Sequence, residues 1–263
     1  MIQLLKQYIR RFFMELKVIS FNIRCCDDKN GHSIEERAPR LAQTILPCDA
    51  DLIGIQEFRP KWEAHFEKYF GKDYELFNKY RDDTRFESAP ILWKKDKFDV
   101  IEKGYFWLSD TPQIMSAGWD SLGHNRICEY VILLHKESGK KFNFMNTHYG
   151  FSDDCQIKSS ALIANKAKEL SALPTFVTGD FNMTPGSAGY AELTKHFADS
   201  NMLTSKDTRA TFHGYAPEKN STEHIDYCFV SEGVTPTHRE LLDKTFDGKY
   251  PSDHYGVFVK LEI

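Results

Sequence analysis

The sequence lacks several features that would assign a chain quickly to a class of protein. It contains no run of 18 apolar residues, so no segment is expected to span a membrane. It has neither a C-x-x-C pair nor an H-E-x-x-H motif, which argues against a zinc hydrolase of another fold. Basic residues are not in excess, because 34 Lys and Arg stand against 38 Asp and Glu, for a formal charge of −4. Sequence-blind binding to duplex DNA usually needs such an excess.

Cysteine is sparse as well. The six residues are scattered along the chain: Cys25, Cys26, Cys48, Cys128, Cys155 and Cys228. The adjacent Cys25 and Cys26 could not easily form a disulfide with each other, and several of the others lie in apolar runs, where a free thiol behaves as a small hydrophobe. We therefore expect reduced cysteines and a cytoplasmic location. We also expect the protein to be a monomer.

The first 13 residues differ in character from the rest. Their apolar positions are interrupted by Lys6, Arg10 and Arg11, and no small-residue cleavage site follows, so they do not match a secretory signal. They are an amphipathic appendage, a surface helix, or residues upstream of a true start at Met14. Residues 14–263 are expected to form a single catalytic domain.

Strand-like segments outnumber helical ones in the remaining sequence. Strands are expected in 16–23, 51–58, 74–80, 89–95, 126–136, 140–150, 173–182, 224–231 and 255–263, with a strand pair in 98–108. Helical spacing of apolar residues predicts helices at 33–46, 62–70 and 159–170. Many of the strands are apolar on both faces, which is typical of sheets covered on both sides. The sequence predicts an α/β fold, a four-layered α/β sandwich in which two packed mixed β-sheets are flanked by helices.

Polar residues recur where these apolar strands end. The set comprises Asn22, Glu57, His148, Asp180, Asn182, Asp226, Asp253 and His254. Buried carboxylates without partners are costly, so a structural role explains the set poorly. Strand ends and their loops are where a rigid scaffold presents functional groups, and we expect these residues to meet in one site.

The residue types suit metal-assisted phosphoryl chemistry. Carboxylate and amide oxygens are hard ligands, which favour Mg²⁺, Mn²⁺ or Ca²⁺ over zinc. Asp180 and Asn182 lie two residues apart on an extended strand and point to the same side, so one can activate water while the other steers it.

Six segments carry a resemblance to a known family. They are SFNIR (20–24), IQE (55–57), NTHYG (146–150), GDFN (179–182), HIDYCFVS (224–231) and PSDHYGV (251–257). In this order they resemble the endonuclease/exonuclease/phosphatase superfamily, which includes pancreatic-type deoxyribonucleases, apurinic endonucleases, inositol polyphosphate 5-phosphatases, neutral sphingomyelinases and deadenylases. The resemblance extends from Ser20 to Val257 and implies hydrolysis of a phosphate ester.

The resemblance also implies roles for individual residues. Glu57 is similar to the principal metal ligand of the family, with Asn22 and Asp253 beside it, and the implied cofactor is Mg²⁺ or Mn²⁺. Asp180 resembles the residue that prepares the attacking water, and Asn182 the one that holds this water or the phosphate.

A second group of residues is implied to act on the substrate. His254 resembles the catalytic histidine of the family, and Asp226 the acid that orients it. His148 matches a further histidine of the deoxyribonuclease branch. Arg126 and Glu87 are similar to substrate-side residues of that branch, an arginine that contacts phosphate and a glutamate near the histidine.

Three interpretations of function remain open at this point. The first is a metal-dependent phosphoesterase, either a nuclease (phosphodiesterase) or a phosphatase for a small molecule, an inositol phosphate or a lipid headgroup. The second is a zinc hydrolase of another fold, but the sequence lacks the motifs of that class. The third is an inactive binding module, in which we would expect Glu57, Asp180 or His254 to have been lost.

Overall fold

The computed structural model describes residues 14–120, 122–170, 173–219 and 223–263, so the predictions for residues 1–13 lie outside the described residues. Two six-stranded sheets form the framework, with strand orders β11-β12-β1-β2-β4-β3 and β5-β6-β7-β8-β10-β9. The strands are β1 (Glu15–Asn22), β2 (Leu52–Gln56), β3 (Tyr74–Phe77), β4 (Ile91–Lys94), β5 (Phe98–Trp107), β6 (Ile127–His135), β7 (Lys141–His148), β8 (Thr175–Asp180), β9 (Ala198–Asp199), β10 (Asp226–Val230), β11 (Thr235–Leu242) and β12 (Gly256–Glu262). The helices are α2 (Ile34–Ile45), η1 (Leu46–Cys48), α3 (Pro60–Phe70), α4 (Asp153–Glu169), α5 (Ala188–Leu193) and α6 (Ser200–Leu203).

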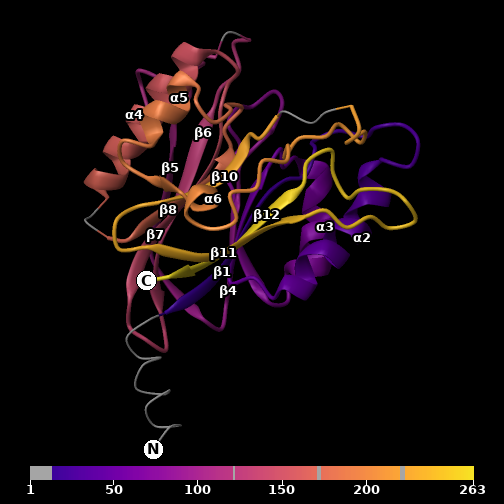
Figure 1. The fold of residues 1–263 in the computed structure, drawn as a ribbon, viewed down its shortest axis with the longest axis horizontal. Coiled ribbons are helices and arrows are strands. Elements are labelled where there is room, and N and C mark those ends of the chain that lie inside the picture. The colour runs from indigo at the N-terminus through magenta and orange to yellow at the C-terminus, as the bar shows by residue number, and fades with distance from the viewer. Residues whose placement is uncertain (1–13, 121, 171–172, 220–222) are drawn as a thin grey trace, which may run out of the picture.

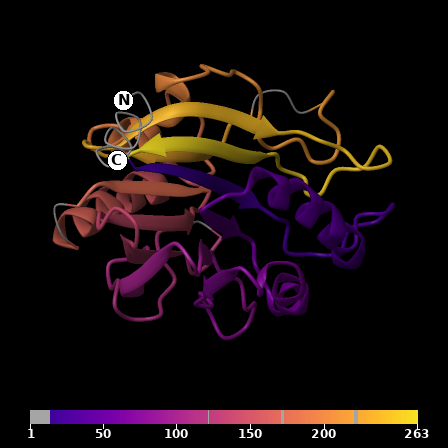
Figure 2. The same cartoon turned by 90° about the horizontal axis from the view of Figure 1, so that it is seen from below.

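The sheets pack face to face, with helices on their outer surfaces (Figures 1 and 2). Side chains such as Val18, Phe144 and Phe176 fill the space between the sheets. A second apolar cluster lies under α2 and α3, and a third under α4 and α5. This arrangement confirms the predicted four-layered sandwich, since strands buried on both faces need cover on both sides. In the part of the chain that the structure describes, no helix combines the length and hydrophobicity required to cross a membrane.

Strand direction explains why distant segments meet at one edge of the sandwich. In each sheet one central pair is parallel, β1 with β2 and β7 with β8, so their carboxyl ends lie together. The prediction that the polar set from Asn22 to His254 lies where strands end was wrong for three of its members. Asp226 is the first residue of β10, and Asp253 and His254 precede β12. These two strands run antiparallel to β8 and β1, so their amino ends reach the same edge.

Some predicted elements have different limits in the structure. The expected strand pair in 98–108 is one strand, β5, which stays paired with β6 across a register shift between Val100 and Glu102. Helix α4 begins at Asp153, well before the predicted start, because Ser152 caps its first turn. Strand β11 was not predicted, since its sequence TPTHRELL shows no regular apolar alternation.

Helix α2 fixes the loop that leads from β1 into the site. It begins with a capping box, in which Ser33 and Glu36 bond each other's backbone N–H groups. The fully buried Arg37 donates hydrogen bonds to the carbonyl oxygens of Ile23, Arg24 and Cys26. These charge-assisted bonds hold the residues that follow Asn22 in a defined conformation.

Candidate active site

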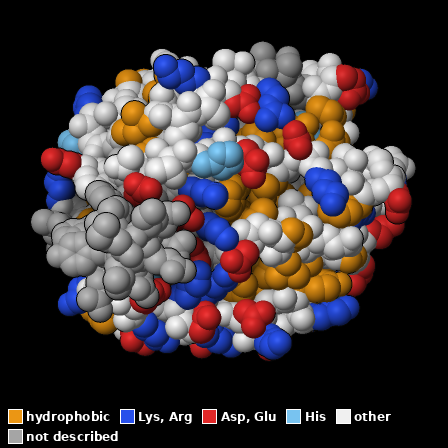
Figure 3. All heavy atoms as spheres, turned by 60° about the horizontal axis from the view of Figure 1, so that its bottom comes forward, with side chains coloured by type: hydrophobic (Ala, Val, Ile, Leu, Met, Phe, Trp, Pro, Cys, Tyr) orange, Lys and Arg blue, Asp and Glu red, His pale blue; other side chains and the backbone are white. Residues whose placement is uncertain are grey.

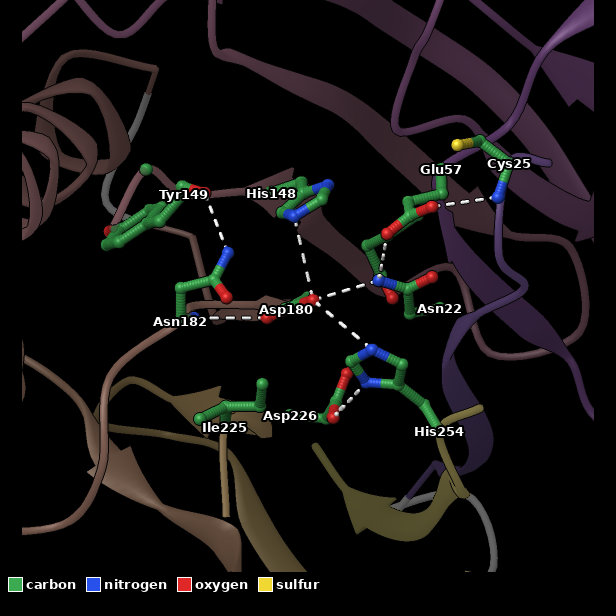
Figure 4. A network of polar contacts seen from close by, with 12 residues as sticks. Asn22, Cys25, Glu57, His148, Tyr149, Asp180, Asn182, Ile225, Asp226 and His254 are labelled. Carbon is green, nitrogen blue, oxygen red and sulfur yellow. Dashed lines mark hydrogen bonds and ion pairs between the residues drawn. The ribbon is translucent and has the colours of Figure 1, made fainter. Parts of the chain in front are cut away.

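Asp180 lies at the centre of the predicted residues, and Figure 4 shows three side chains converging on it. Its Oδ2 accepts a hydrogen bond from Asn22 Nδ2 at 2.8 Å. The Nε2 atoms of His148 and His254 lie 3.6 Å and 3.9 Å from the same oxygen. Both distances exceed a normal hydrogen bond, so neither imidazole bonds Asp180 directly. Asp180 is buried, with 2% of the residue exposed.

His254 and Asp226 form a direct pair, as predicted from the resemblance. His254 Nδ1 lies 2.9 Å from Asp226 Oδ2, and both residues are buried. Burial disfavours the charged ring, but the carboxylates of Asp226, Asp180 and Asp253 outweigh this effect and raise the pKa of His254 to about 10. At neutral pH the ring is therefore a cation that faces Asp180.

His148 is electrostatically the opposite of His254. Burial lowers its pKa well below the usual value, and the positive charges of Arg126 and Arg81 act in the same direction. The two imidazoles on either side of Asp180 thus differ at neutral pH, one neutral and one charged. A neutral ring can donate one hydrogen bond and accept another, whereas the charged ring donates two.

Asp180 itself is poised to exchange a proton near neutral pH. Burial, together with the negative charge of Asp226, raises its pKa to about 7, against the opposing effects of His254 and of hydrogen bonds from Asn22 and Asn182. A carboxylate with a pKa near the operating pH is well suited to act as a general base.

Asn182 is held beside Asp180 by its own backbone. Its N–H donates to Asp180 Oδ1 at 3.0 Å, and its side-chain Nδ2 donates to the carbonyl oxygen of Tyr149 at 3.0 Å. Asn182 has a left-handed backbone conformation with φ 49°, which Asn tolerates better than most residues. Its side-chain oxygen remains available to face water or phosphate.

Glu57 lies on the other side of Asn22. Its Oε1 accepts a hydrogen bond from Asn22 Nδ2 at 3.2 Å, and its Oε2 accepts one from the Cys25 N–H at 2.8 Å. Burial opposes ionisation of Glu57, but these bonds and the charge of His254 lower its pKa. Asn22 therefore also joins Glu57 to Asp180 as a hydrogen-bond donor, which the sequence did not predict.

The predicted metal ligands form a suitable donor set. Burial raises the pKa of Asp253, and the negative charge of Glu57 raises it further, so the two carboxylates lie within electrostatic reach of each other. Arg24 Nε lies 3.7 Å from Asp253 Oδ2. Two neighbouring carboxylates suit a hard divalent cation, which would offset their repulsion. Asn22 turns its Nδ2 towards Glu57, and its Oδ1 accepts a hydrogen bond from the Arg24 N–H, so its oxygen is not directed at the carboxylates in this structure.

A second group of possible ligands includes the catalytic pair. Among the described residues, ligand-type atoms of Asp180, Asp226 and His254 lie within 4.8 Å of one another. Two of these atoms already bond each other in the His254–Asp226 pair, so we interpret this group as acid–base machinery. The donor set around Glu57 is the better candidate for a metal site.

Glu87 and Arg126 lie on the His148 side of the site, and each has a close partner that the sequence did not reveal. Glu87 Oε1 is 3.8 Å from His148 Nδ1, but it bonds Arg81 Nη1 at 2.6 Å, and its Oε2 bonds Arg59 Nη2 at 3.1 Å. The buried Arg126 donates from Nε to Asp120 Oδ2 at 2.9 Å. Neither Arg81 nor Asp120 belongs to a recognisable motif, and Arg59 could have been noticed only because it follows Glu57 by two residues.

The structure brings all ten predicted site residues to this edge of the sandwich.

Comparison with known proteins adds a family match. A model of the Endonuclease/Exonuclease/phosphatase family matches residues 19–254 of the chain. An endonuclease/exonuclease/phosphatase family protein from Bacteroides thetaiotaomicron is 30% identical, with a TM-score of 0.89 over 95% of this chain and 98% of that chain. A mannosyl-6-phosphatase from Bacteroides thetaiotaomicron is also 30% identical, with a TM-score of 0.86 over 94% of this chain and 99% of that chain.

A more distant likeness is one of fold alone. D. rerio TDP2 in a complex with a single-strand DNA product is 20% identical, with a TM-score of 0.74 over 94% of this chain and 98% of that chain. The same sandwich therefore accommodates proteins of very different sequence.

Proposed function

This chain belongs to the Endonuclease/Exonuclease/phosphatase family, and on that basis we propose that it hydrolyses a phosphate ester with the help of a divalent metal ion. The observation that carries the proposal is the position of Asp180 Oδ2, which lies 3.6 Å and 3.9 Å from two imidazole Nε2 atoms. In the proposed reaction a water molecule and a phosphate oxygen bind beside this carboxylate.

In the proposed reaction, Asp180 accepts a proton from water as the water oxygen attacks phosphorus in line with the leaving group. Asn182 steers the water, and the charged His254 ring donates a hydrogen bond to the phosphate, whose negative charge increases in the transition state. His148 and Arg126 contact the phosphate from the other side. A metal ion held by Glu57, with Asn22 and Asp253 beside it, would supply Lewis-acid polarisation of a phosphate oxygen.

We propose a compact phosphorylated molecule, such as a sugar phosphate, as the substrate. The mannosyl-6-phosphatase at 30% identity supports this class. The burial of His254, Asp226 and Asp180 favours a small group that enters a narrow site. The formal charge of −4 argues in the same direction, because binding along a duplex usually needs an excess of basic residues. On the one face that Figure 3 draws, Lys and Arg side chains are interspersed with Asp and Glu.

A nuclease is the second candidate. The position of Arg126 favours it, because the charge of Arg126 acts on His148. Arg126 also matches the arginine expected from the deoxyribonuclease resemblance. A panel of sugar 6-phosphates, inositol phosphates, nucleotides, bis(p-nitrophenyl) phosphate, RNA and plasmid DNA separates the two candidates. If inorganic phosphate is released from a phosphate monoester faster than any diester is cleaved, the first candidate is supported. If plasmid DNA is nicked at a lower protein concentration than monoester hydrolysis needs, the second is supported. A folded, metal-loaded protein that cleaves none of them contradicts both.

We expect hydrolysis to require Mg²⁺ or Mn²⁺ and to stop on chelation with EDTA, because the carboxylates of Glu57 and Asp253 offer oxygen donors. Added Mg²⁺ should also raise the melting temperature, since a ligand that binds only the folded state stabilises it. Glu57→Gln is the matched control and should lose most of this thermal shift. Full turnover after exhaustive chelation, or an equal Mg²⁺-dependent shift in Glu57→Gln, would contradict the metal assignment.

A further inference from the structure

The core between the two sheets changes from apolar to polar side chains directly beneath the site. Along β7, the inward-facing Phe142 and Phe144 are followed by Asn146 and then by His148. The same step occurs along β8, where Phe176 is followed by Thr178 and Asp180, and along β1, where Val18 is followed by Ser20 and Asn22. Residues two apart on a strand share a face, so a layer of buried polar side chains separates the apolar core from the candidate site.

Asn146 connects the members of this layer. It is completely buried, and its side chain contacts both sheets. Its Oδ1 accepts hydrogen bonds from Gln56 Nε2 at 2.7 Å and from Thr178 Oγ1 at 2.9 Å. Its Nδ2 points at the carbonyl oxygens of Ile55, Ala89 and Pro90, at 2.7, 3.0 and 3.1 Å. A buried amide with all its hydrogen-bonding capacity engaged has a single favourable orientation.

Gly54 makes the approach of Asn146 to the opposite sheet possible. A Cβ atom at this position would lie 2.5 Å from Asn146 Oδ1 and 2.2 Å from Thr178 Oγ1. No side chain fits in that space, so β2 must carry glycine where the amide crosses from β7. The glycine is therefore explained by the contact it permits.

Three of the five residues that Asn146 contacts lie two positions from a candidate site residue, and Gln56 and Pro90 lie one and three positions from one. Thr178 precedes Asp180 on β8, and Ile55 precedes Glu57. Asn146 itself precedes His148 on β7. Ala89 follows Glu87 in the segment before β4. The Asn146 side chain thus contacts segments that carry three of these residues and itself precedes the fourth, so it links two site residues from each sheet.

We propose that Asn146 is a positioning residue that fixes the separation of Asp180 and His148 from Glu57 and Glu87. The proposal rests on the proposed hydrolysis, because that reaction gives the separation its importance. A misplacement of reacting groups by about 1 Å can cost about 100-fold in rate. The amide acts through its hydrogen bonds and does not touch the substrate.

Asn146→Leu should lower kcat by about 100-fold while KM changes by less than about threefold, since orientation is lost but binding groups remain. Asn143→Leu is the control for residue type, because Asn143 is buried on the other face of the same strand. Phe144→Leu is the control for lost stability, because it opens a cavity on the same face, one step deeper in the core. Both controls should keep the wild-type kcat. A kcat in Asn146→Leu equal to that of Phe144→Leu would overturn the proposal.

A gentler pair of variants covers the case in which Asn146→Leu does not fold. Thr178→Val removes the hydroxyl that bonds Asn146 Oδ1 and should lower kcat by about tenfold. Thr178→Ser keeps a hydroxyl and should recover most of that loss. Equal kcat values in the two variants would contradict the proposal.

Hydrogen exchange tests the positioning role independently of turnover. In Thr178→Val, compared with Phe144→Leu, amides of 55–58, 87–89 and 147–149 should exchange faster while the rest of β7 stays protected. If the wild-type protein cleaves no phosphate ester, the proposed function fails, and this exchange pattern still decides whether Asn146 orders the site. Equal exchange in both variants would overturn its role.

Discussion

Asp226→Asn should lower kcat by about 100-fold or more, with a much smaller change in KM, because the carboxylate acts by keeping His254 oriented and charged. It should also change the pH dependence. Asp226 favours the protonated ring and helps to raise the pKa of His254 to about 10, so its loss lowers that pKa. The limb on which activity falls with rising pH should therefore move to lower pH.

The double variant Asp226→Asn/His254→Ala separates a coupled pair from two independent residues. If Asp226 acts only through His254, the double variant should be little slower than His254→Ala alone. Steady-state rates across the pH range give both results. Additive losses, or an unchanged pH profile in Asp226→Asn, would mean that the pair is not coupled and that His254 acts only as a phosphate contact.

Asp180→Asn should lower kcat by about 1,000-fold and at the same time stabilise the metal-free protein. An amide cannot accept the proton of the attacking water. The stability gain has a separate cause, since the pKa of Asp180 is raised from 3.8 to about 7 by burial and by Asp226. A raised carboxyl pKa means that the folded state binds the proton more tightly, so the charged carboxylate destabilises it.

The sign of this effect gives a pH window. The destabilisation by Asp180 is absent below about pH 4, develops as pH rises towards 7 and is complete above it. The gain in free energy of unfolding for Asp180→Asn should follow the same course and reach on the order of 2 kcal/mol at pH 8. Urea unfolding in EDTA at several pH values measures it. A gain in free energy of unfolding that does not depend on pH, or a loss at pH 8, would contradict this account, in which the charged carboxylate of Asp180 destabilises the folded state.

Much of the fold could be predicted because its strands carry a strong pattern. The apolar runs that contain Phe144 and Phe176 identified central strands, and the helical spacing after Ser33 identified α2. Strand β11 escaped prediction because it lies at a sheet edge, where only alternate residues such as Arg239 and Leu241 are buried. Edge strands pack on fewer neighbours, so their sequences are less constrained.

The site could be predicted where its residues stand in motifs, as Asp180, His254 and Glu57 do. The roles of Arg81 and Asn146 could not, because each depends on contacts between segments far apart in the sequence. Asn146 in particular bonds Ile55 across 91 positions. Only the three-dimensional packing of the two sheets turns an ordinary buried amide into a link between the halves of the site.

The central claim is that this edge of the sandwich directs water onto the phosphorus of an ester. The most direct measurement is hydrolysis in ¹⁸O-labelled water with Mg²⁺, using the best substrate of the panel and mass spectrometry of both products. The account predicts one ¹⁸O atom in the released phosphate, none in the alcohol, and loss of the reaction in Asp180→Asn. Label in the alcohol, or unchanged turnover in Asp180→Asn, would contradict it.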